Sequence, residues 1–198
     1  MAGTFKLGIA VALVLGVAWV GARAQNGKPA AVERPVLQVD PAWPKIPNGW
    51  SLGQVASAAS DSSDHIWVLH RSRVIRAGQK TGPPVMEFDA AGNYVQGWGG
   101  TGQGHPWVSS EHGIYVDHKG FVWIGGQGDD DQILKFTKTG KFVLQVGRNG
   151  EKKTNKSTTN FWKPADVFVY PKTNELFVAD GYGNKRIIVF DAETGAYK

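Results

Sequence analysis

The chain has 198 residues, no cysteine and a formal net charge of +5 at pH 7. Without cysteine it has no disulfide and no thiol nucleophile, so its stability must come from core packing or from metal. Two basic residues fall in the first 24 positions, and beyond them 20 Lys and Arg face 17 Asp and Glu. This balance, with both signs interspersed, gives no reason to expect nucleic acid or an acidic membrane as a partner.

Residues 1–24 have the layout of a secretory signal peptide. Lys6 precedes the apolar run LGIAVALVLGVAWVGA, and Ala22-Arg23-Ala24 forms an A-x-A cleavage site before Gln25. The run is shorter than the roughly 20 residues of a membrane span, which favours cleavage, with an uncleaved anchor as the alternative. We therefore expect a secreted or periplasmic protein with no membrane attachment beyond the export signal.

Residues 25–48 are rich in Pro and Ala and are predicted to be a leader. Beyond them one pattern occurs three times: two apolar strands joined by a polar turn, a variable loop, a third strand ending in Phe, and a Gly-containing turn into a fourth strand. The third-strand residues Phe88, Phe136 and Phe190 lie 48 and 54 residues apart. A period near 50 with four short strands per unit indicates a β-propeller blade.

The predicted fold is therefore all-β, a β-propeller with blades at about residues 49–100, 101–150 and 160–198. Three predicted hairpin turns end in Gly, the residue that supplies a positive φ after a type I turn: DAAG at 89–92, DHKG at 117–120 and TKTG at 137–140. A β-sandwich is the alternative, but it does not predict this recurrence in register. Propellers close with 4 to 8 blades, so we expect completion by a longer product or by another chain.

Four features could project toward the channel mouth, where inner strands and loops of a propeller meet. His112 begins an innermost strand and is a good metal ligand, although it can equally be structural. Arg71, after His70, could hold an anionic group or pair with an acid. Tyr182, in the loop DGYGNKR, could be an acid or base or a packing residue. The acidic run 129–131 lacks the spaced pattern of a calcium loop and is expected to be solvated surface.

Three segments resemble the lyase domain of peptidylglycine α-amidating enzymes, the peptidyl-α-hydroxyglycine amidating lyases. These segments are GQVASAASDSSDHIWVLHRSR, EHGIYVDHKGFVWIGG and KPADVFVYPKTNELFVADGYGNKRIIVF, which occur in the order of that family's motifs. The resemblance implies an NHL-type propeller of six blades, of which this chain supplies about three. It also implies cleavage of a peptide ending in α-hydroxyglycine into a peptide amide and glyoxylate.

The resemblance assigns a role to four residues. His112 matches a zinc-binding histidine, Arg71 the active-site arginine and Tyr182 the proposed general base, while the carbonyl of Ile114 matches a backbone ligand of a structural calcium. The match is incomplete. Gly183 replaces a disulfide-forming Cys, and Ser72-Arg73 replaces Gly-Asp.

The sequence thus favours an exported lyase-like propeller with a small-molecule or peptide substrate, with catalytic zinc and with structural calcium. A single histidine cannot hold a catalytic zinc that needs about three protein ligands, so we expect the isolated chain to be inactive. The alternative is a non-enzymatic envelope propeller that binds a peptide, glycan or protein. A calcium-dependent lactonase is disfavoured, because the innermost strand starts offer His112 and Asp166 rather than a Glu/Asn/Asp ligand set.

Overall fold

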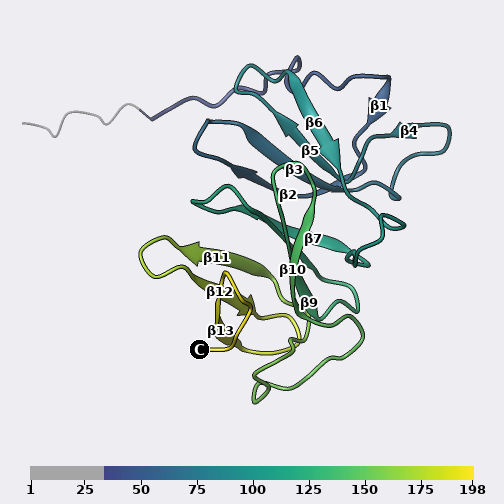
Figure 1. Ribbon diagram of the computed structural model, residues 1–198. Helices are drawn as coiled ribbons and strands as arrows, with labels where there is room; N and C mark the ends of the chain where they lie inside the picture. The colour runs from purple at the N-terminus through teal and green to yellow at the C-terminus, as the bar shows by residue number, and fades with distance from the viewer. Residues whose placement is uncertain (1–33) are drawn as a thin grey trace, which may run out of the picture. The chain divides into compact units, whose positions relative to one another are not determined.

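The computed structural model describes residues 34–198, and Asp40–Lys198 form one compact unit (Figure 1). Residues 34–39 are exposed and have no regular secondary structure. The predicted signal peptide and the first part of the predicted leader lie outside the described residues. Among residues 34–198, no helix is long and apolar enough to cross a membrane. The compact unit begins inside the predicted leader, where Trp43 and Ile46 pack on the core of the first sheet.

All regular structure in the described part is β-strand, and three antiparallel sheets account for most of it (Figure 1). The first sheet has the order β2 (Gln54–Ser60), β3 (Ile66–Arg71), β5 (Val85–Phe88), β6 (Tyr94–Trp98). The second has the order β7 (Glu111–Val116), β8 (Val122–Gly126), β9 (Gln132–Phe136), β10 (Phe142–Gly147). The third has β11 (Asp166–Tyr170), β12 (Glu175–Asp180), β13 (Arg186–Asp191).

Each sheet is a meander in which consecutive strands are neighbours, as in a propeller blade. We call the three sheets blades 1, 2 and 3. An isolated bridge from Phe190 to Tyr197 continues blade 3 beyond β13. A small parallel pair, β1 (Trp50–Ser51) with β4 (Lys80–Thr81), accompanies blade 1. The fold is a partial β-propeller, which confirms the predicted fold class.

The glycine turns that the sequence predicted close the hairpins. Gly92, Gly120 and Gly140 have φ values of 81°, 81° and 80°, a region that disfavours residues with a side chain. The amide of each glycine bonds the carbonyl three residues earlier, at 2.9 to 3.0 Å. Each loop is thus a three-residue hairpin loop, in which a type I turn is followed by a residue in the left-handed helical conformation. This geometry is compatible with the right-handed twist of the two strands.

An aspartate and a tryptophan six residues apart lock the first hairpin of blades 1 and 2. Asp117 Oδ2 accepts the indole N–H of Trp123 at 2.8 Å, while Oδ1 accepts two amides of the turn at 2.9 Å. Asp61 and Trp67 repeat this arrangement at 3.2 Å in blade 1. Both tryptophans are fully buried, so the aspartate satisfies an indole donor that could not otherwise reach water.

Two apolar clusters join neighbouring blades. The first contains side chains of blades 1 and 2, and the second contains side chains of blades 2 and 3. The repeated third-strand residues Phe88, Phe136 and Phe190 are at most 1% exposed, so the repeat seen in the sequence marks the core. Because each blade buries its faces against the next, the inner strands are held at fixed positions.

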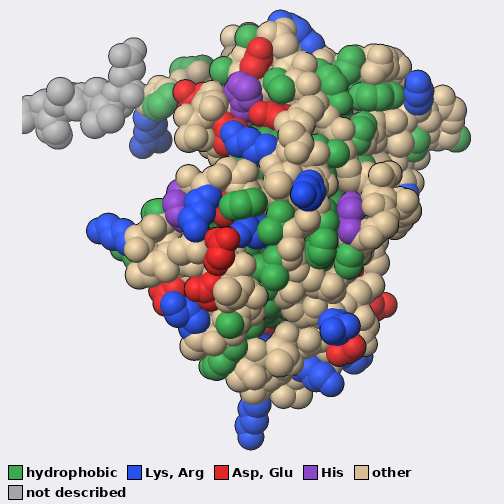
Figure 2. Space-filling model, in the orientation of Figure 1, with side chains coloured by type: hydrophobic (Ala, Val, Ile, Leu, Met, Phe, Trp, Pro, Cys, Tyr) green, Lys and Arg blue, Asp and Glu red, His purple; other side chains and the backbone are tan. Residues whose placement is uncertain are grey.

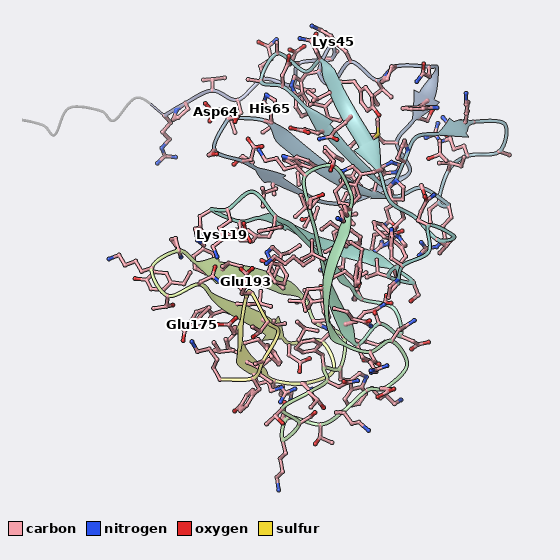
Figure 3. All side chains as sticks on the ribbon, viewed as in Figure 1. Lys45, Asp64, His65, Lys119, Glu175 and Glu193 are labelled. Atoms are coloured by element: carbon pink, nitrogen blue, oxygen red, sulfur yellow. The ribbon has the colours of Figure 1, made fainter. Side chains whose placement is uncertain are left out.

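Ion pairs and a buried lysine also join the blades at their outer turns. Lys138 of the β9–β10 turn bonds Asp61 of blade 1 at 2.7 Å, and Lys119 meets Glu193 at 3.2 Å (Figure 3). Lys135 is buried, donates to the Ala192 carbonyl at 2.7 Å and lies 4.1 Å from the centre of the Phe121 ring. Burial lowers the pKa of Lys135. On the face in view, basic and acidic side chains are interspersed (Figure 2).

The pair of Lys138 and Asp61 makes the fold sensitive to acid. Burial alone would raise the pKa of Asp61, but hydrogen bonds, first that from Lys138, outweigh it and lower the pKa from 3.8 to about 2. When folding lowers the pKa of an acid, the ionised acid stabilises the folded state at pH values above its unfolded pKa. This stabilisation is lost as the pH falls through the folded pKa. The contribution is therefore complete above about pH 4 and fades toward pH 2.

Lys138→Met should lower the free energy of unfolding by about 1 kcal/mol at pH 6 and by less at pH 2. The effect at pH 6 is small because Lys138 is partly exposed to solvent. Urea unfolding at both pH values measures this difference. Lys141→Met is the matched control, since exposed Lys141 on the same hairpin makes no ion pair within residues 34–198. An equal loss at both pH values, or an equal loss from the control, would contradict the role of the pair.

Candidate active site

His112 lies at a bulge in β7, the strand at one edge of blade 2. The pairing of β7 with β8 shifts register between Glu111 and Gly113, so His112 faces no partner residue on β8. A bulge of this kind re-aims a side chain, and here it directs His112 toward blade 3. His112 Nδ1 lies 3.0 Å from the carbonyl of Ala165, and Nε2 lies 3.1 Å from the hydroxyl of Tyr182.

These two contacts determine the tautomer of neutral His112. A backbone carbonyl only accepts hydrogen bonds, so Nδ1 carries the proton and donates it to Ala165. Nε2 then presents a lone pair, to which the Tyr182 hydroxyl donates. A histidine that is oriented through Nδ1 and keeps a lone pair on Nε2 can ligate a metal, which would then replace the Tyr182 hydroxyl as the partner of Nε2.

Tyr182 lies on the loop between β12 and β13 with its side chain over His112. The two rings meet edge to face, with centroids 5.2 Å apart and an interplanar angle of 76°. Tyr182 is 55% exposed, so solvent reaches this residue although it also contacts the histidine. The sequence predicted both residues as site candidates but could not bring them into contact, because they lie 70 positions apart.

Buried Asp180 anchors this tyrosine loop. Its carboxylate accepts the amide of Trp162 at 2.9 Å, the side-chain amide of Asn184 at 2.7 Å and the guanidinium of Arg186 at 2.8 Å. Arg186 also reaches backbone carbonyls of the β10–β11 connection at Asn155, Ser157 and Asn160. The Asp, Asn and Arg of the DGYGNKR motif therefore fix the loop that carries the tyrosine.

Trp162 covers the glycine that follows the tyrosine. A Cβ built on Gly183 would lie 2.2 Å from Trp162 Cγ, so no side chain fits there without moving the indole. The Gly183 amide also donates to the Trp162 carbonyl at 3.0 Å. Gly183 stands where the resembling family has a cysteine, and in this chain packing against Trp162 holds the loop at that point. Sequence reasoning missed Trp162, although the unusual glycine was a signal of a close neighbour.

Arg71 ends β3 of blade 1 and reaches the start of β7. Its Nε donates to the carbonyl of Glu111 at 3.0 Å, and an Nη donates to Gln54 at 2.7 Å. Glu111 directly precedes His112, so Arg71 places a fixed positive charge beside the histidine strand. Within residues 34–198 no acid pairs with Arg71. Its neighbour Arg73 instead forms an ion pair with the buried carboxylate of Glu111, at 2.6 Å.

His70 is structural. It is fully buried, accepts the amide of Gly53 at 3.0 Å through Nδ1 and donates from Nε2 to the carbonyl of Pro83 at 2.8 Å. Burial lowers its pKa and favours the neutral ring that these two bonds require.

The carbonyl of Ile114 points toward the free edge of β7. At the hairpin end the amide of Asp117 bonds the carbonyl of Phe121, and hydrogen-bonded pairs alternate along an antiparallel ladder. Counting back from that hydrogen-bonded pair, the pair of Ile114 with Ile124 is one without hydrogen bonds between its backbones. The Ile114 carbonyl is therefore directed away from β8. A backbone oxygen at such an edge is a suitable calcium ligand, although one oxygen is far from a complete set.

A second group of potential metal ligands lies at the outer end of blade 1. Ligand atoms of Asp61, His65 and Glu87 lie within 4.8 Å of one another (His65 is labelled in Figure 3). The Glu87 carboxylate bonds His65 at 2.7 Å and raises the pKa of that histidine. The ammonium of Lys138 already bonds Asp61, so the group is an ion-pair network with a cation supplied by the chain itself.

The expectation that residues 129–131 form solvated surface was right for Asp129, which is exposed, and wrong for the other two residues. Asp130 and Asp131 are 0% and 2% exposed. Asp130 accepts the amide and hydroxyl of Ser109 at 2.7 and 2.9 Å and the amide of Ser110 at 2.8 Å. The acidic loop folds back onto the segment that leads into β7, because that segment offers amides with no strand partner.

Comparison with known proteins gives relatives of two kinds. No family model matches the chain. NHL repeat-containing protein 3 of Mus musculus is 26% identical over 165 residues, covering 79% of this chain and 44% of the relative. A probable peptidyl-alpha-hydroxyglycine alpha-amidating lyase, pgal-1 of Caenorhabditis elegans, is 37% identical over 82 residues, covering 41% and 23%. Peptidyl-alpha-hydroxyglycine alpha-amidating lyase 2 of Drosophila melanogaster is 29% identical over 180 residues, covering 82% and 41%. The chain spans less than half of each relative.

The packing of Trp162 on Gly183 gives a test of the loop. Gly183→Ala should lower the free energy of unfolding by about 1–3 kcal/mol, because the new methyl group must displace the indole. The matched control is Gly181→Ala, two residues earlier, where a Cβ meets nothing within 4 Å. Denaturant unfolding measures both. If the two substitutions had equal effects, Trp162 would not be what holds the loop.

Proposed function

We propose that this chain, which is related to NHL repeat-containing proteins and to peptidyl-α-hydroxyglycine α-amidating lyases, forms part of an exported lyase. The reaction would cleave the C–N bond of a peptidyl-α-hydroxyglycine to give a peptide amide and glyoxylate. The observation that carries the proposal is the meeting of His112 and Tyr182 across blades 2 and 3 at 3.1 Å, beside Arg71 from blade 1. These are the residues that the resemblance assigned to the reaction.

The proposed chemistry needs a base at the substrate hydroxyl and a proton at the departing nitrogen. The hydroxyl of α-hydroxyglycine loses its proton, its oxygen forms the aldehyde C=O of glyoxylate, and the C–N bond breaks with its electron pair on nitrogen. Tyr182 would first release its own hydroxyl proton to solvent. As the phenolate it would take the proton of the substrate hydroxyl and return it to the departing nitrogen, so that it acts first as base and then as acid. Its exposed side chain, held against the His112 ring, is accessible to a substrate.

Arg71 would hold the negative charge of the substrate. The α-hydroxyglycine residue ends in a carboxylate, and a guanidinium binds carboxylates with a fixed fork of N–H donors. Two bonds, to Glu111 and Gln54, already fix the orientation of the Arg71 side chain. A preset orientation reduces the entropy that binding would cost.

Zinc is the metal that the resemblance implies, and His112 fits the role of one ligand, because Ala165 orients the ring and leaves the Nε2 lone pair. Zinc, when bound, supplies a Lewis acid that acidifies a substrate hydroxyl. A catalytic zinc takes about three protein ligands, and at this edge the described residues offer one, so further ligands would have to join His112. The Ile114 carbonyl would likewise give one oxygen to a structural calcium.

Glyoxylate release from a synthetic peptidyl-α-hydroxyglycine by the zinc-loaded, full-length gene product tests the proposed reaction. Tyr182→Phe should lower kcat by about 100-fold or more, because it removes the acid–base group. The matched control is Tyr170→Phe on the same blade, which should leave kcat unchanged. Absence of release from folded, zinc-loaded protein would contradict the lyase and favour a binding propeller.

Zinc retention tests the metal part of the proposal. Zinc bound per protein, measured by atomic emission after dialysis, should fall at least tenfold in His112→Gln. His65→Gln removes the histidine of the outer Asp–His–Glu group and should leave the zinc content unchanged, because Lys138 already supplies that group with a cation. The reverse pattern would place the metal at the outer group and refute the role of His112.

A further inference from the structure

A cavity of about 340 Å³ lies beside the tyrosine loop. It is lined by Asp129, Asp131, Gly150, Lys152, Trp162 and Lys163. These residues come from the β8–β9 loop and from the connection between β10 and β11 (Figure 1). The carbonyl of Lys163 accepts the amide of Tyr182 at 3.3 Å, so the cavity adjoins the candidate catalytic residue.

Asp131 is the unexplained residue of this cavity. It is 2% exposed, and its Oδ1 has no hydrogen-bond partner within the described part of the chain. Its neighbour Asp130 is equally buried but accepts three hydrogen bonds. Buried carboxylate oxygens without a donor are unusual in native proteins and call for an explanation, such as a bound ion or ligand.

The lysines of the cavity do not neutralise Asp131. Neither Lys152 nor Lys163 forms an ion pair with an acid among residues 34–198. The Lys152 ammonium lies instead 5.6 Å from the centre of the Trp162 ring. The aromatic wall thus already attracts a cation, while one oxygen of the Asp131 carboxylate beside it, Oδ1, lacks a donor among the described residues.

We propose that this cavity is a subsite for a positively charged side chain of the peptide substrate. Asp131 would accept a hydrogen bond from the ammonium or guanidinium, Asp129 would add a second negative charge, and Trp162 would pack against the stem and the cation. That the bound peptide is a substrate rests on the proposed lyase function, whereas binding of the cation does not.

The position of the cavity fits a residue shortly before the scissile bond. The carbonyls of Lys163 and Trp162 hold the amides of Tyr182 and Gly183, so the cavity and the catalytic loop share one stretch of backbone. An extended peptide advances roughly 3.3–3.6 Å per residue, so a long basic side chain a few residues upstream can reach Asp131. A neighbouring hollow that shares Lys152 and Trp162 also carries Lys153 and Lys156, whose charges would keep a cation on the Asp131 side.

A free divalent ion is a poorer occupant than an organic cation. Calcium and magnesium take six or more oxygen ligands, and the walls present two aspartates beside two lysines and an indole. An arginine or lysine side chain needs only one or two acceptors and gains from packing its stem on Trp162.

Binding should depend on pH. Burial raises the pKa of Asp131, opposed by the amide of Lys163, while the charges of Asp130 and Asp129 raise it further and that of Lys152 lowers it. The cation requires the ionised carboxylate. Affinity should therefore fall on acidification, beginning at a higher pH than for an ordinary aspartate.

The test is calorimetric titration of the full-length gene product with two unreactive peptides, acetyl-Arg-Ala-Gly and acetyl-citrulline-Ala-Gly. Citrulline keeps the shape of arginine without its charge. The arginine peptide should bind at least tenfold more tightly, and Asp131→Asn should abolish that preference. Asp64→Asn, which changes an exposed acid on another blade, is the control and should preserve it.

Equal binding of the two peptides to the unmodified protein would overturn the proposal, as would a full preference retained in Asp131→Asn. Displacement of the arginine peptide by calcium or zinc that itself requires Asp131 would assign the cavity to a metal instead. If Asp131→Asn fails to fold, Trp162→Phe combined with Asp129→Asn must reduce the preference at least threefold, or the proposal fails. The binding measurement needs no turnover of substrate. Loss of the arginine preference would therefore disprove the subsite, whereas absence of glyoxylate release would disprove the lyase reaction.

Discussion

Packing of each blade against the next is the constraint on which the rest of this structure depends. A small antiparallel sheet buries both faces only between two neighbours, and the two main apolar clusters are shared between consecutive blades. That packing fixes where the inner strands and their loops lie. Arg71 of blade 1 can then bond the carbonyl before His112 of blade 2, and His112 can meet Tyr182 of blade 3. The candidate site is a consequence of the blade interfaces.

Polar groups then set the details that packing leaves open. Asp130 binds the segment before β7, and Asp180 binds the tyrosine loop to the β10–β11 connection. Each of these carboxylates is buried and satisfied by three donors. Buried groups of this kind give a loop one preferred conformation, because any other leaves a charge without a partner. Asp131 differs in having one oxygen that no donor of residues 34–198 reaches, and for this reason we place a ligand beside it.

Much of the fold could be predicted from the sequence, because it repeats. The spacing of Phe88, Phe136 and Phe190 and the glycines of the hairpin turns reflect core positions and backbone conformations that each blade needs. The site candidates Arg71, His112 and Tyr182 came from residue type and from resemblance. Their convergence could not be read from the chain, since it depends on blade packing.

The features that the sequence did not reveal are contacts between distant segments. The bulge at His112 is a matter of strand register, which no single residue signals. Trp162 meets Gly183 through folding of a long connection. The acidic residues 129–131 look like surface by composition, yet two of them are buried because nearby amides need acceptors.

The proposed reaction requires one metal-assisted site, built by blades 2 and 3 around His112 and Tyr182. Anomalous diffraction at the zinc absorption edge from crystals of the full-length gene product tests it most directly. A zinc peak is expected about 2.0–2.1 Å from His112 Nε2, beside the Tyr182 hydroxyl. A zinc peak at Asp61, His65 and Glu87 instead, or none near His112 in zinc-soaked crystals, would contradict it.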